Sequence, residues 1–345
     1  MIKKECFTAE WIEQVSSELH YNDKNLIEKV IRALSLLEML VKAGCPLVFK
    51  GGTALMLILG KSAHRLSIDI DLICPPGTNI EDYLKSFADF GFINLELVER
   101  KQRDDADIPK SHSKFFYQIA YRNDTDAQSY ILLDVLYEDI HYFRTQQIAI
   151  NCPFIRLEGK PLMVTVPSAE DILGDKLTAF APNTTGIPYY KNGRSCSMEI
   201  AKQLYDVGRL FENVSDLQIT KEAFRKIAVV ELSYRSFGTD IGQVFNDIRQ
   251  TALCISTRGK AGEGDFDLIQ DGIIRVKSFM YKQRYLIDHA IIDAARAAYL
   301  ATLIEKGINE IESYSNNPAD IKDMVIRPSL PLSLIHISEP TRHAQ

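Results

Sequence analysis

A diglycine turn followed closely by a pair of alternating aspartates constrains this 345-residue chain more than any other feature. The turn, Lys-Gly-Gly-Thr at residues 50–53, separates an apolar segment at 46–49 from an apolar run at 53–59. The first segment is typical of a buried strand, and the second of a helix that Gly60 ends. Because glycine lacks a side chain, the turn allows another group to approach the backbone closely.

The aspartate pair lies in Arg65-Leu-Ser67-Ile-Asp69-Ile-Asp71, where acidic and apolar residues alternate over 68–73. A period of two indicates a strand, in which residues i and i+2 point to the same side. Asp69 and Asp71 are therefore expected to share one strand face. Two adjacent carboxylates repel each other, and Mg²⁺, which prefers oxygen ligands and also binds substrate phosphates, would compensate.

Together the two motifs favour one kind of chemistry. A glycine turn that leads into a helix presents free backbone N–H groups and a positive helix end to an anion. A phosphate cradle beside paired carboxylates suits metal-assisted phosphoryl or nucleotidyl transfer. Either motif alone is more often a plain turn or a solvated strand edge, but their order (strand, diglycine, helix, acidic strand) favours catalysis.

Residues 49–55 and 65–72 resemble the AbiEii/AbiGii toxin family of nucleotidyltransferases, within the DNA polymerase beta-like superfamily. The resemblance extends over about residues 45–215. It implies an α+β fold: a polymerase beta-like nucleotidyltransferase core with a small mixed sheet, plus an α-helical C-terminal region. It also implies an NTP substrate, a cognate antitoxin protein and a role in toxin–antitoxin or phage-defence systems. Relatives modify the 3′ end of tRNA, so tRNA is the expected acceptor.

The resemblance adds two further candidate site residues, Asp134 and Lys176. Asp134 lies inside the apolar segment 130–137, where an acid is costly unless it is paired or binds a metal. It matches the superfamily's third carboxylate on a neighbouring strand; pairing with Arg65 or Lys50 is the alternative. Lys176 matches a Lys-Leu-x-Ala motif and would stabilise charge on the leaving pyrophosphate. The alternative is an ordinary surface lysine.

Lys202 and Asp206 resemble a third family motif, [Arg/Lys]-Asp-x-x-Asp. Gln203 stands where an aspartate is frequent in that motif. Lys202 and Asp206 are spaced i, i+4 and therefore share a helix face. The resemblance makes Asp206 a base or metal-network residue and Lys202 a phosphate contact, whereas a routine helix salt pair is the alternative.

The expected site follows from these matches. The expected catalytic residues are Asp69, Asp71, Asp134, Lys176 and Asp206, and the first three are also expected to bind Mg²⁺ or Mn²⁺. The expected nucleotide-binding residues are Lys50, Gly51, Gly52, Thr53, Arg65, Ser67, Lys176 and Lys202.

Hydrophobic periodicity predicts the secondary structure of the rest of the chain. Helices are expected at 24–42 with Asp23 as N-cap, at 80–90, from Ser168 as N-cap through 180, and at 198–211, 221–234, 241–256, 268–281 and 287–306. Strands are expected at 92–99, 115–121 and 130–137. The polar segment 100–114 is expected to be an exposed hairpin loop or a basic rim for nucleic acid. The loop 182–195 is expected to be either an active-site lid with stacking aromatics or a disordered connection.

We expect a nucleotidyltransferase core at 1–166, a helical domain at 167–328 and a non-native tail at 329–345, which resembles translated sequencing-adapter sequence. Six scattered cysteines without a C-x-x-C motif indicate reduced thiols rather than a zinc site or a disulfide framework. The chain lacks a signal core and any apolar run near the ~20 residues that span a bilayer, so we expect no membrane contact and a cytoplasmic location. The net charge of −6 means that RNA binding would need a local basic patch.

Three other functions stay open at this stage. The chain is alternatively a small-molecule nucleotidyltransferase of the aminoglycoside-modifying kind, or an enzyme that attaches a nucleotide to a protein hydroxyl. It is also alternatively a catalytically inactive binding protein that keeps the fold. The intact diglycine and Asp-x-Asp motifs favour an enzyme over the last of these.

Overall fold

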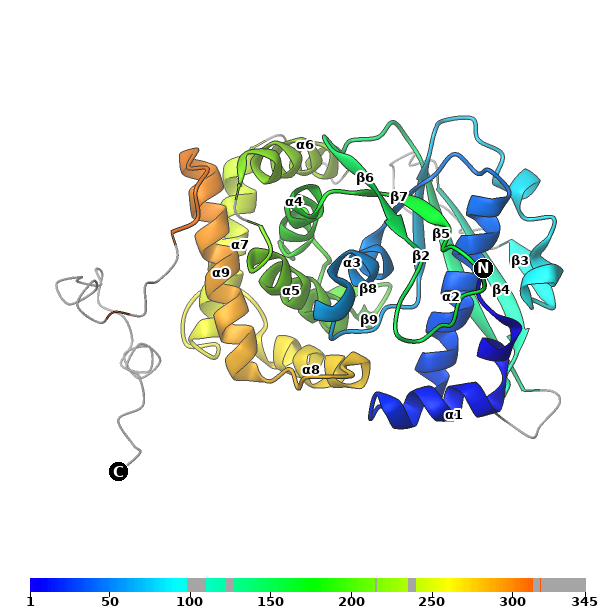
Figure 1. The fold of residues 1–345 in the computed structure, drawn as a ribbon. Helices are drawn as coiled ribbons and strands as arrows, with labels where there is room; N and C mark the ends of the chain where they lie inside the picture. Colours follow the sequence, from blue (N-terminus) through cyan, green and yellow to red (C-terminus); the bar gives the residue numbers. More distant parts are fainter. Residues whose placement is uncertain (98–109, 122–126, 215, 235–239, 313–316, 318–345) are drawn as a thin grey trace, which may run out of the picture. The chain divides into compact units, whose positions relative to one another are not determined.

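The computed structural model describes residues 1–97, 110–121, 127–214, 216–234, 240–312 and 317 (Figure 1). The chain divides into two compact units. The first comprises Met1–Ile172 and the short later segment Val276–Arg284, and the second comprises Leu173–Arg275 and Tyr285–Gln345. The domain boundary expected after residue 166 stays a prediction. The expected non-native tail, 329–345, lies outside the described residues.

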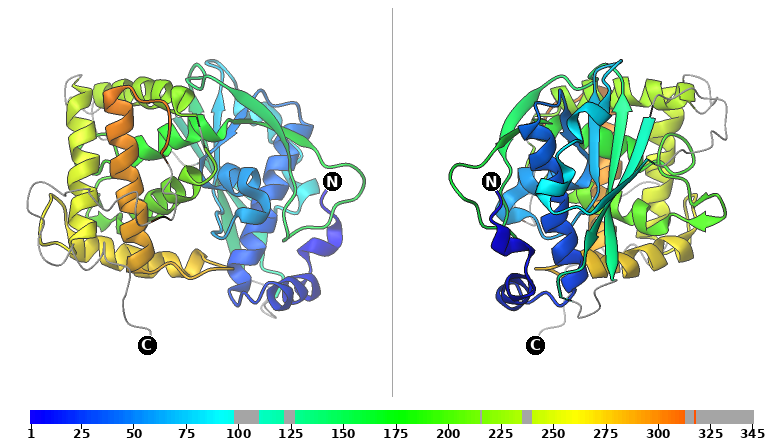
Figure 2. Two further views of the ribbon diagram at one scale, coloured as in Figure 1. Left: turned by 60° about the vertical axis from the view of Figure 1, so that its left-hand side comes forward. Right: turned by 90° about the vertical axis from the view of Figure 1, so that its right-hand side faces the viewer.

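The first unit is built on a small mixed sheet of five strands among the described residues, in the order β1-β2-β5-β4-β3 (Figures 1 and 2). Its strands are β1 (Val48–Lys50), β2 (Ile70–Cys74), β3 (Asn94–Leu97), β4 (Lys110–Gln118) and β5 (Gln128–Tyr137). β2 and β5 are parallel, and the other neighbours are antiparallel. The mixed sheet is therefore confirmed, and the strands expected near 115–121 and 130–137 pair with each other as β4 and β5.

Helix α2 (Lys24–Lys42) packs against β2 and β5. Its bounds match the prediction, and the Asp23 side chain accepts a hydrogen bond from the Leu26 N–H at 3.0 Å, as expected of an N-cap. Alternate residues of β5 (Ile131, Leu133 and Val135) are buried in the core, so the residues between them lie on the opposite sheet face. The remaining helices and strands of this unit are η1 (Lys4–Phe7), α1 (Ala9–Glu18), α3 (Gly51–Leu59), η2 (Gly60–Ser62), β6 (Thr145–Ala149) and β7 (Met163–Pro167).

The structure corrects two expectations in this unit. The helix expected at 80–90 is instead two 3₁₀ turns, η3 (Ile80–Tyr83) and η4 (Phe87–Phe90). Turns with three residues per turn also bring apolar residues three apart to one side, so the short spacings did not distinguish them from an α-helix. The polar segment expected to be a loop through residue 114 contributes its last residues to β4, and its residues 100–109 lie outside the described residues.

The second unit is helical, as predicted. It contains α5 (Ser197–Phe211), α6 (Gln218–Tyr234), α7 (Ile241–Ser256), α8 (Phe266–Val276) up to Arg275, and α9 (Ile287–Lys306), together with α4 (Ala169–Ala179) from Leu173 onward. The short helix η5 (Lys277–Phe279) falls in the first unit. A small hairpin, β8 (Tyr190–Lys191) with β9 (Arg194–Ser195), precedes α5. Asn192 and Gly193 have φ of +52° and +73° at its turn, which suits a tight two-residue hairpin. No helix of the described chain could cross a membrane.

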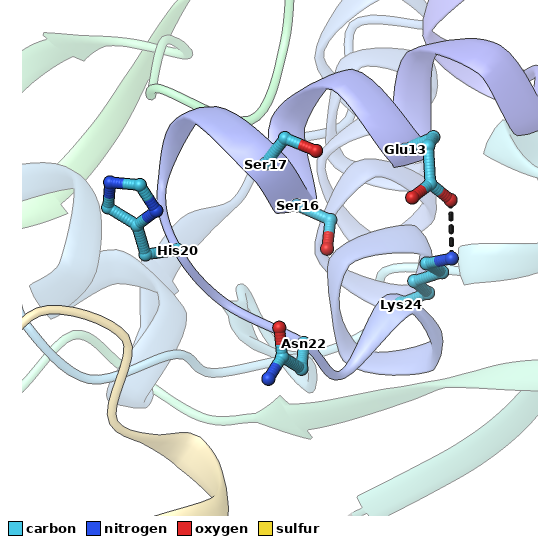
Figure 3. Close-up of a pocket in the computed structure, with 6 residues that line it drawn as sticks. All are labelled: Glu13, Ser16, Ser17, His20, Asn22 and Lys24. Carbon is cyan, nitrogen blue, oxygen red and sulfur yellow. Dashed lines mark ion pairs between the residues drawn. The ribbon is translucent and has the colours of Figure 1, made fainter.

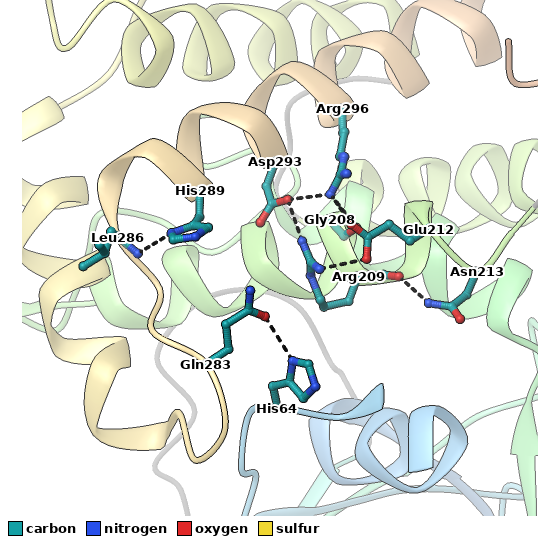
Figure 4. A network of polar contacts seen from close by, with 10 residues as sticks. All are labelled: His64, Gly208, Arg209, Glu212, Asn213, Gln283, Leu286, His289, Asp293 and Arg296. Carbon is teal, nitrogen blue, oxygen red and sulfur yellow. Dashed lines mark hydrogen bonds and ion pairs between the residues drawn. The ribbon is translucent and has the colours of Figure 1, made fainter. Parts of the chain in front are cut away.

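A polar cluster around the buried Asp293 joins α5 to α9 (Figure 4). Asp293 accepts hydrogen bonds from Arg209 at 3.3 Å and Arg296 at 3.1 Å, and both arginines also reach Glu212. A Cβ on Gly208 would lie 2.0 Å from Asp293 Oδ1, so the missing side chain makes room for the carboxylate. Burial raises the pKa of Asp293, and the two arginines counteract that effect.

Candidate active site

The diglycine turn holds the second aspartate of the acidic motif. Helix α3 begins at Gly51, directly after β1, and Gly51 has a φ of +78°. A Cβ at residue 51 would lie 2.1 Å from Asp71 Oδ2, and a Cβ at residue 52 would lie 2.7 Å from Ser67 Oγ. Only glycine at both positions lets these side chains lie against the turn. The expected close approach to the glycine backbone is therefore confirmed.

The first turn of α3 also fixes the backbone between Ser67 and Asp71. The buried Thr53 hydroxyl donates a hydrogen bond to the Asp69 carbonyl at 2.7 Å. Because that carbonyl bonds to the helix, β2 begins only at Ile70. Asp69 therefore precedes the strand and is exposed, while Asp71 lies within it and is half-buried. The strand expected at 68–73 therefore begins two residues later, and the expectation that both aspartates share one face stays a prediction.

Asp134 lies beside Asp71, in register on the adjacent parallel strand. The strand pairing sets Lys50 opposite Asp71, Asp71 beside Asp134, and Asp134 opposite His112. Directly paired residues project to the same side of a sheet. The four side chains therefore form one row across β1, β2, β5 and β4, which we call the acidic row. All four are half-buried.

The partner of Asp134 is His112, not Lys50 or Arg65. His112 Nδ1 lies 2.5 Å from Asp134 Oδ1. The sequence interpretation missed His112 because Lys-Ser-His-Ser-Lys at 110–114 looks like a solvated loop. One signal in the sequence was available, because the segment alternates as a strand does. Ser113, a small polar residue, is 1% exposed and points into the core, while its neighbours His112 and Lys114 point to the other face of the sheet.

The loop that carries Arg65 and Ser67 is braced by the late segment of the first unit. Arg65 forms an isolated β-bridge with Met280, and the Leu66 N–H donates to the Phe279 carbonyl at 2.8 Å. His64 Nδ1 lies 3.1 Å from Gln283 Oε1, a contact also drawn in Figure 4. The Arg65 guanidinium is itself buried, and its Nη2 lies where a Cβ on Gly52 would be 3.0 Å away. Backbone pairing over this sequence distance leaves no local pattern, so the sequence did not predict it.

The structure brings two of the three expected metal ligands together. Among the residues that it describes, no group of three or more His, Cys, Asp or Glu side chains is arranged to hold a metal ion. Asp71 and Asp134 nevertheless stand in register, with Asp71 seated in the space left by Gly51. Two carboxylates fit Mg²⁺, which usually takes one or two protein carboxylates and completes its shell with water and substrate phosphates.

Lys176, in the second unit, lies in a buried ion pair. Its Nζ is 3.1 Å from Asp206 Oδ2 and donates to Gln203 Oε1 at 2.9 Å. The side chains of Lys176 and Asp206 are only 9% and 2% exposed. The ordinary surface lysine is therefore ruled out. Gln203, the departure from the family motif, is a neutral acceptor beside a pair whose charges already balance. Lys202 lies half-buried on α5, the helix that also carries Asp206. The roles expected of Lys176, Lys202 and Asp206 in the reaction stay predictions.

The loop at 182–195 is not a disordered connection. Asp247 of α7 accepts hydrogen bonds from the Asn183 backbone and side chain at 2.9 and 2.8 Å and from the Thr184 hydroxyl at 2.8 Å. Thr185 is buried and donates to the Thr178 carbonyl at 2.9 Å. These contacts fix the first half of the loop, and the lid interpretation stays a prediction.

A polar hollow of about 560 Å³ lies elsewhere in the first unit, where α1 is followed by α2 (Figure 3). It is lined by Glu13, Ser16, Ser17, His20, Asn22 and Lys24. Glu13 and Lys24 form an ion pair with each other, and both are well exposed. None of the expected site residues lines this hollow, so it is not our candidate.

Comparison with known proteins agrees with the chemistry of the site. A family model described as the nucleotidyl transferase AbiEii toxin of type IV toxin–antitoxin systems matches residues 34–302. That span contains every expected site residue and most of the chain, so the protein belongs to this family of nucleotidyltransferase toxins. It is thus an enzyme with a nucleotide substrate, and its family implies an antitoxin partner. No curated protein matches.

Three of the matching solved structures come from Helicobacter pylori and Mycobacterium tuberculosis. JHP933 from Helicobacter pylori is 16% identical, with 89% of this chain and 95% of that chain covered and a TM-score of 0.41. A putative nucleotidyltransferase from H. pylori is 17% identical, with 83% and 94% covered and a TM-score of 0.38. MenT4, a nucleotidyltransferase toxin from Mycobacterium tuberculosis, is 14% identical, with 85% and 89% covered and a TM-score of 0.46.

Proposed function

We propose that this toxin transfers a nucleoside monophosphate from an NTP to the 3′ end of tRNA, with Mg²⁺ or Mn²⁺ as cofactor, in the cytoplasm. One observation carries the proposal. The Asp71 carboxylate lies against Gly51 at the start of α3 and is in register with Asp134 on the next strand. A helix N-terminus for phosphate and two carboxylates for a metal therefore lie side by side.

The phosphate-binding role falls to the turn and its neighbours. The first N–H groups of a helix have no partner within the helix and carry the positive end of its dipole. Gly51, Gly52 and Thr53 supply these groups at the start of α3, and they would hold the β- and γ-phosphates. Lys50 and Arg65 add positive charge near the turn, and Ser67 lies against Gly52.

Asp71 and Asp134, together with Asp69 just before β2, would hold the metal. A bound divalent cation neutralises charge on the phosphoryl oxygens and orients the triphosphate. Asp134 would align the acceptor hydroxyl. The acceptor oxygen bonds to the α-phosphorus while its proton passes to Asp134, the bond between the α-phosphorus and the β-phosphate oxygen breaks, and pyrophosphate leaves. On the family resemblance, Lys176 offsets charge on the pyrophosphate, Asp206 is a base or metal-network residue, and Lys202 contacts phosphate.

The sheet face that carries Asp134 supports an RNA acceptor. Phe116 and Tyr130 lie on this face with ring centroids 5.7 Å apart. The ammonium groups of Lys29 and Lys114 are each 5.5 Å from the Tyr130 ring centroid. Single-stranded nucleic acid is bound by aromatic rings that stack bases and by cations that contact the backbone. At ~3.3 Å per residue of strand, Tyr130 lies about 13 Å along β5 from Asp134, within reach of a few nucleotides.

Labelled-nucleotide transfer tests this proposal. The protein is incubated with each labelled NTP and Mg²⁺ or Mn²⁺, in separate reactions with total tRNA, with small-molecule acceptors and with cell proteins. Label at the tRNA 3′ end that disappears in Asp71→Ala is the expected result. Label only on a small molecule or a protein would replace tRNA with that acceptor. Absence of transfer to every acceptor would contradict the proposed reaction.

A further inference from the structure

We propose that His112 is the positioning residue of Asp134, holding one carboxylate oxygen so that the other faces the reacting groups. The inference deepens the proposed function and rests on the role given there to Asp134. Within the residues that the structure describes, His112 is the side chain that pairs with Asp134. It is not among the residues that the family resemblance implies.

The strand register explains why this pairing is specific. His112 and Asp134 are directly opposite on antiparallel β4 and β5, where side chains on one face are closest. The His112 side chain is 11% exposed, against 36% for Asp134, so the ring is held in the fold while the carboxylate remains accessible. A second cross-strand hydrogen bond, Ser111 Oγ to Tyr137 OH at 2.8 Å, joins the same two strands.

The charges along the acidic row explain why Asp134 needs a partner that fixes its orientation. Asp71 and Asp134 are like charges on adjacent strands, and like charges side by side are destabilising. Each carboxylate has its own restraint: the Gly51 backbone lies against Asp71, and the His112 ring lies against Asp134. An ionised carboxylate only accepts hydrogen bonds, so His112 Nδ1 must carry the proton that it shares with Oδ1.

This arrangement leaves Asp134 Oδ2 for the acceptor hydroxyl or the metal. Hydrogen bonds from outer residues fix the orientation of ligating carboxylates, and their loss typically costs about 10- to 100-fold in metal affinity or activity. His112 thus acts through Asp134 and does not itself touch substrate. The consequence is a requirement for a donor at Nδ1, not for a histidine as such.

Substitution of His112 tests that requirement. His112→Ala removes the donor, whereas His112→Asn places an amide N–H close to the position of Nδ1. We expect His112→Ala to lower kcat about 10- to 100-fold with little change in the KM for NTP, and His112→Asn to recover most of the loss. His289→Ala is the matched control, because His289 also uses Nδ1 in one hydrogen bond, to the Leu286 N–H. Equal losses in His112→Ala and His112→Asn, with both variants folded, would overturn the proposal.

A double-mutant cycle separates positioning from general structural support. If His112 acts only through Asp134, adding His112→Ala to Asp134→Ala should change residual activity by less than about 2-fold. A further 10-fold loss in the double variant would show that His112 acts elsewhere. Thermal unfolding of each variant establishes that the compared proteins are folded.

The metal-free protein provides a readout that does not depend on activity. Nitrogen NMR of the histidine rings distinguishes a ring protonated at Nδ1 from one protonated only at Nε2. We expect Nδ1 of His112 to be protonated, and its signal to move in Asp134→Ala. A ring with bare Nδ1 would refute the pairing. If the NMR result holds but RNA is not labelled, the choice of acceptor fails and the pairing stands.

Discussion

The carboxylate of Asp71 occupies the space that a side chain at Gly51 would need, with Oδ2 only 2.1 Å from the position of a Cβ. Gly51→Ala must therefore displace Asp71 or the start of α3, and it also places alanine at a φ of +78°. We predict a loss of transfer activity of at least about 100-fold, since two of the groups proposed for the reaction move apart. Initial rates with labelled NTP measure the effect.

Gly44→Ala is the control for that experiment. Gly44 has a φ of +76°, and a Cβ there would meet nothing within 4 Å. In both variants an alanine in the left-handed backbone conformation costs about 1–2 kcal/mol, so both substitutions should lower the melting temperature. Only Gly51→Ala should lose activity while folded. Equal activity in the two variants would show that the contact between Gly51 and Asp71 has no part in the reaction.

The aromatic pair on β4 and β5 is predicted to bind the acceptor. Tyr130→Ala removes one of the two neighbouring rings, and loss of a base-stacking ring typically costs about 1–3 kcal/mol. We expect the KM for RNA to rise about 5- to 150-fold while the KM for NTP stays unchanged. Phe143→Ala removes another half-exposed ring of the same unit and should leave both constants unchanged. A rise in the NTP constant alone would place Tyr130 on the nucleotide instead.

Lys176 is predicted to have both a structural and a catalytic role. Lys176→Ala leaves Asp206 buried without its counter-ion, which typically costs about 3–5 kcal/mol. Replacing both partners, in Lys176→Met with Asp206→Leu, should restore much of that stability. Urea unfolding measures the stability of both variants. If Lys176 offsets charge on pyrophosphate, the folded double variant stays inactive. Recovery of activity in the double variant would show that the ion pair has only a structural role.

Local signals explain the parts of the fold that the sequence predicted. The Asp23 cap and the apolar periodicity of 24–42 define α2 because helix ends and faces depend on residues only a few positions apart. The diglycine turn was predicted for the same reason, and its contact with the acidic motif follows from the absence of side chains at Gly51 and Gly52. The single acid within the apolar segment 130–137 was enough to identify Asp134 as unusual.

The parts that the sequence did not predict depend on long-range pairing. His112 lies in a polar strand whose inward position is Ser113, so hydrophobicity gave no signal for its pairing with Asp134. The return of Val276–Arg284 to the first unit combines backbone hydrogen bonds to the loop at 64–66 with burial of Tyr281 against Phe154, and contacts over this sequence distance leave no local pattern. The start of β2 after Asp69 is a further example, because there the Thr53 hydroxyl, 16 residues away in the sequence, donates a hydrogen bond to the Asp69 carbonyl.

The buried Asp247 predicts how stability varies with pH. Burial raises the pKa of Asp247, and hydrogen bonds from Asn183, Thr184 and Thr251 only partly offset that effect. As the pH rises above the ordinary value of 3.8, the unfolded chain releases this proton before the folded chain does. Folding stability from this group is therefore fully present below that pH and is lost as the pH rises through the raised folded value.

Asp247→Asn removes this titration while keeping an oxygen that accepts hydrogen bonds. We expect the free energy of unfolding of the natural protein, minus that of Asp247→Asn, to decrease as the pH rises from 3.8 toward neutrality. Urea titrations over a pH series measure both proteins, and other titrating groups largely cancel in the difference. Asp240→Asn, which removes an exposed carboxylate at the start of the same helix, controls for loss of one charge. A difference that increases with pH would mean that the hydrogen bonds outweigh burial and that the folded chain favours the ionised form of Asp247.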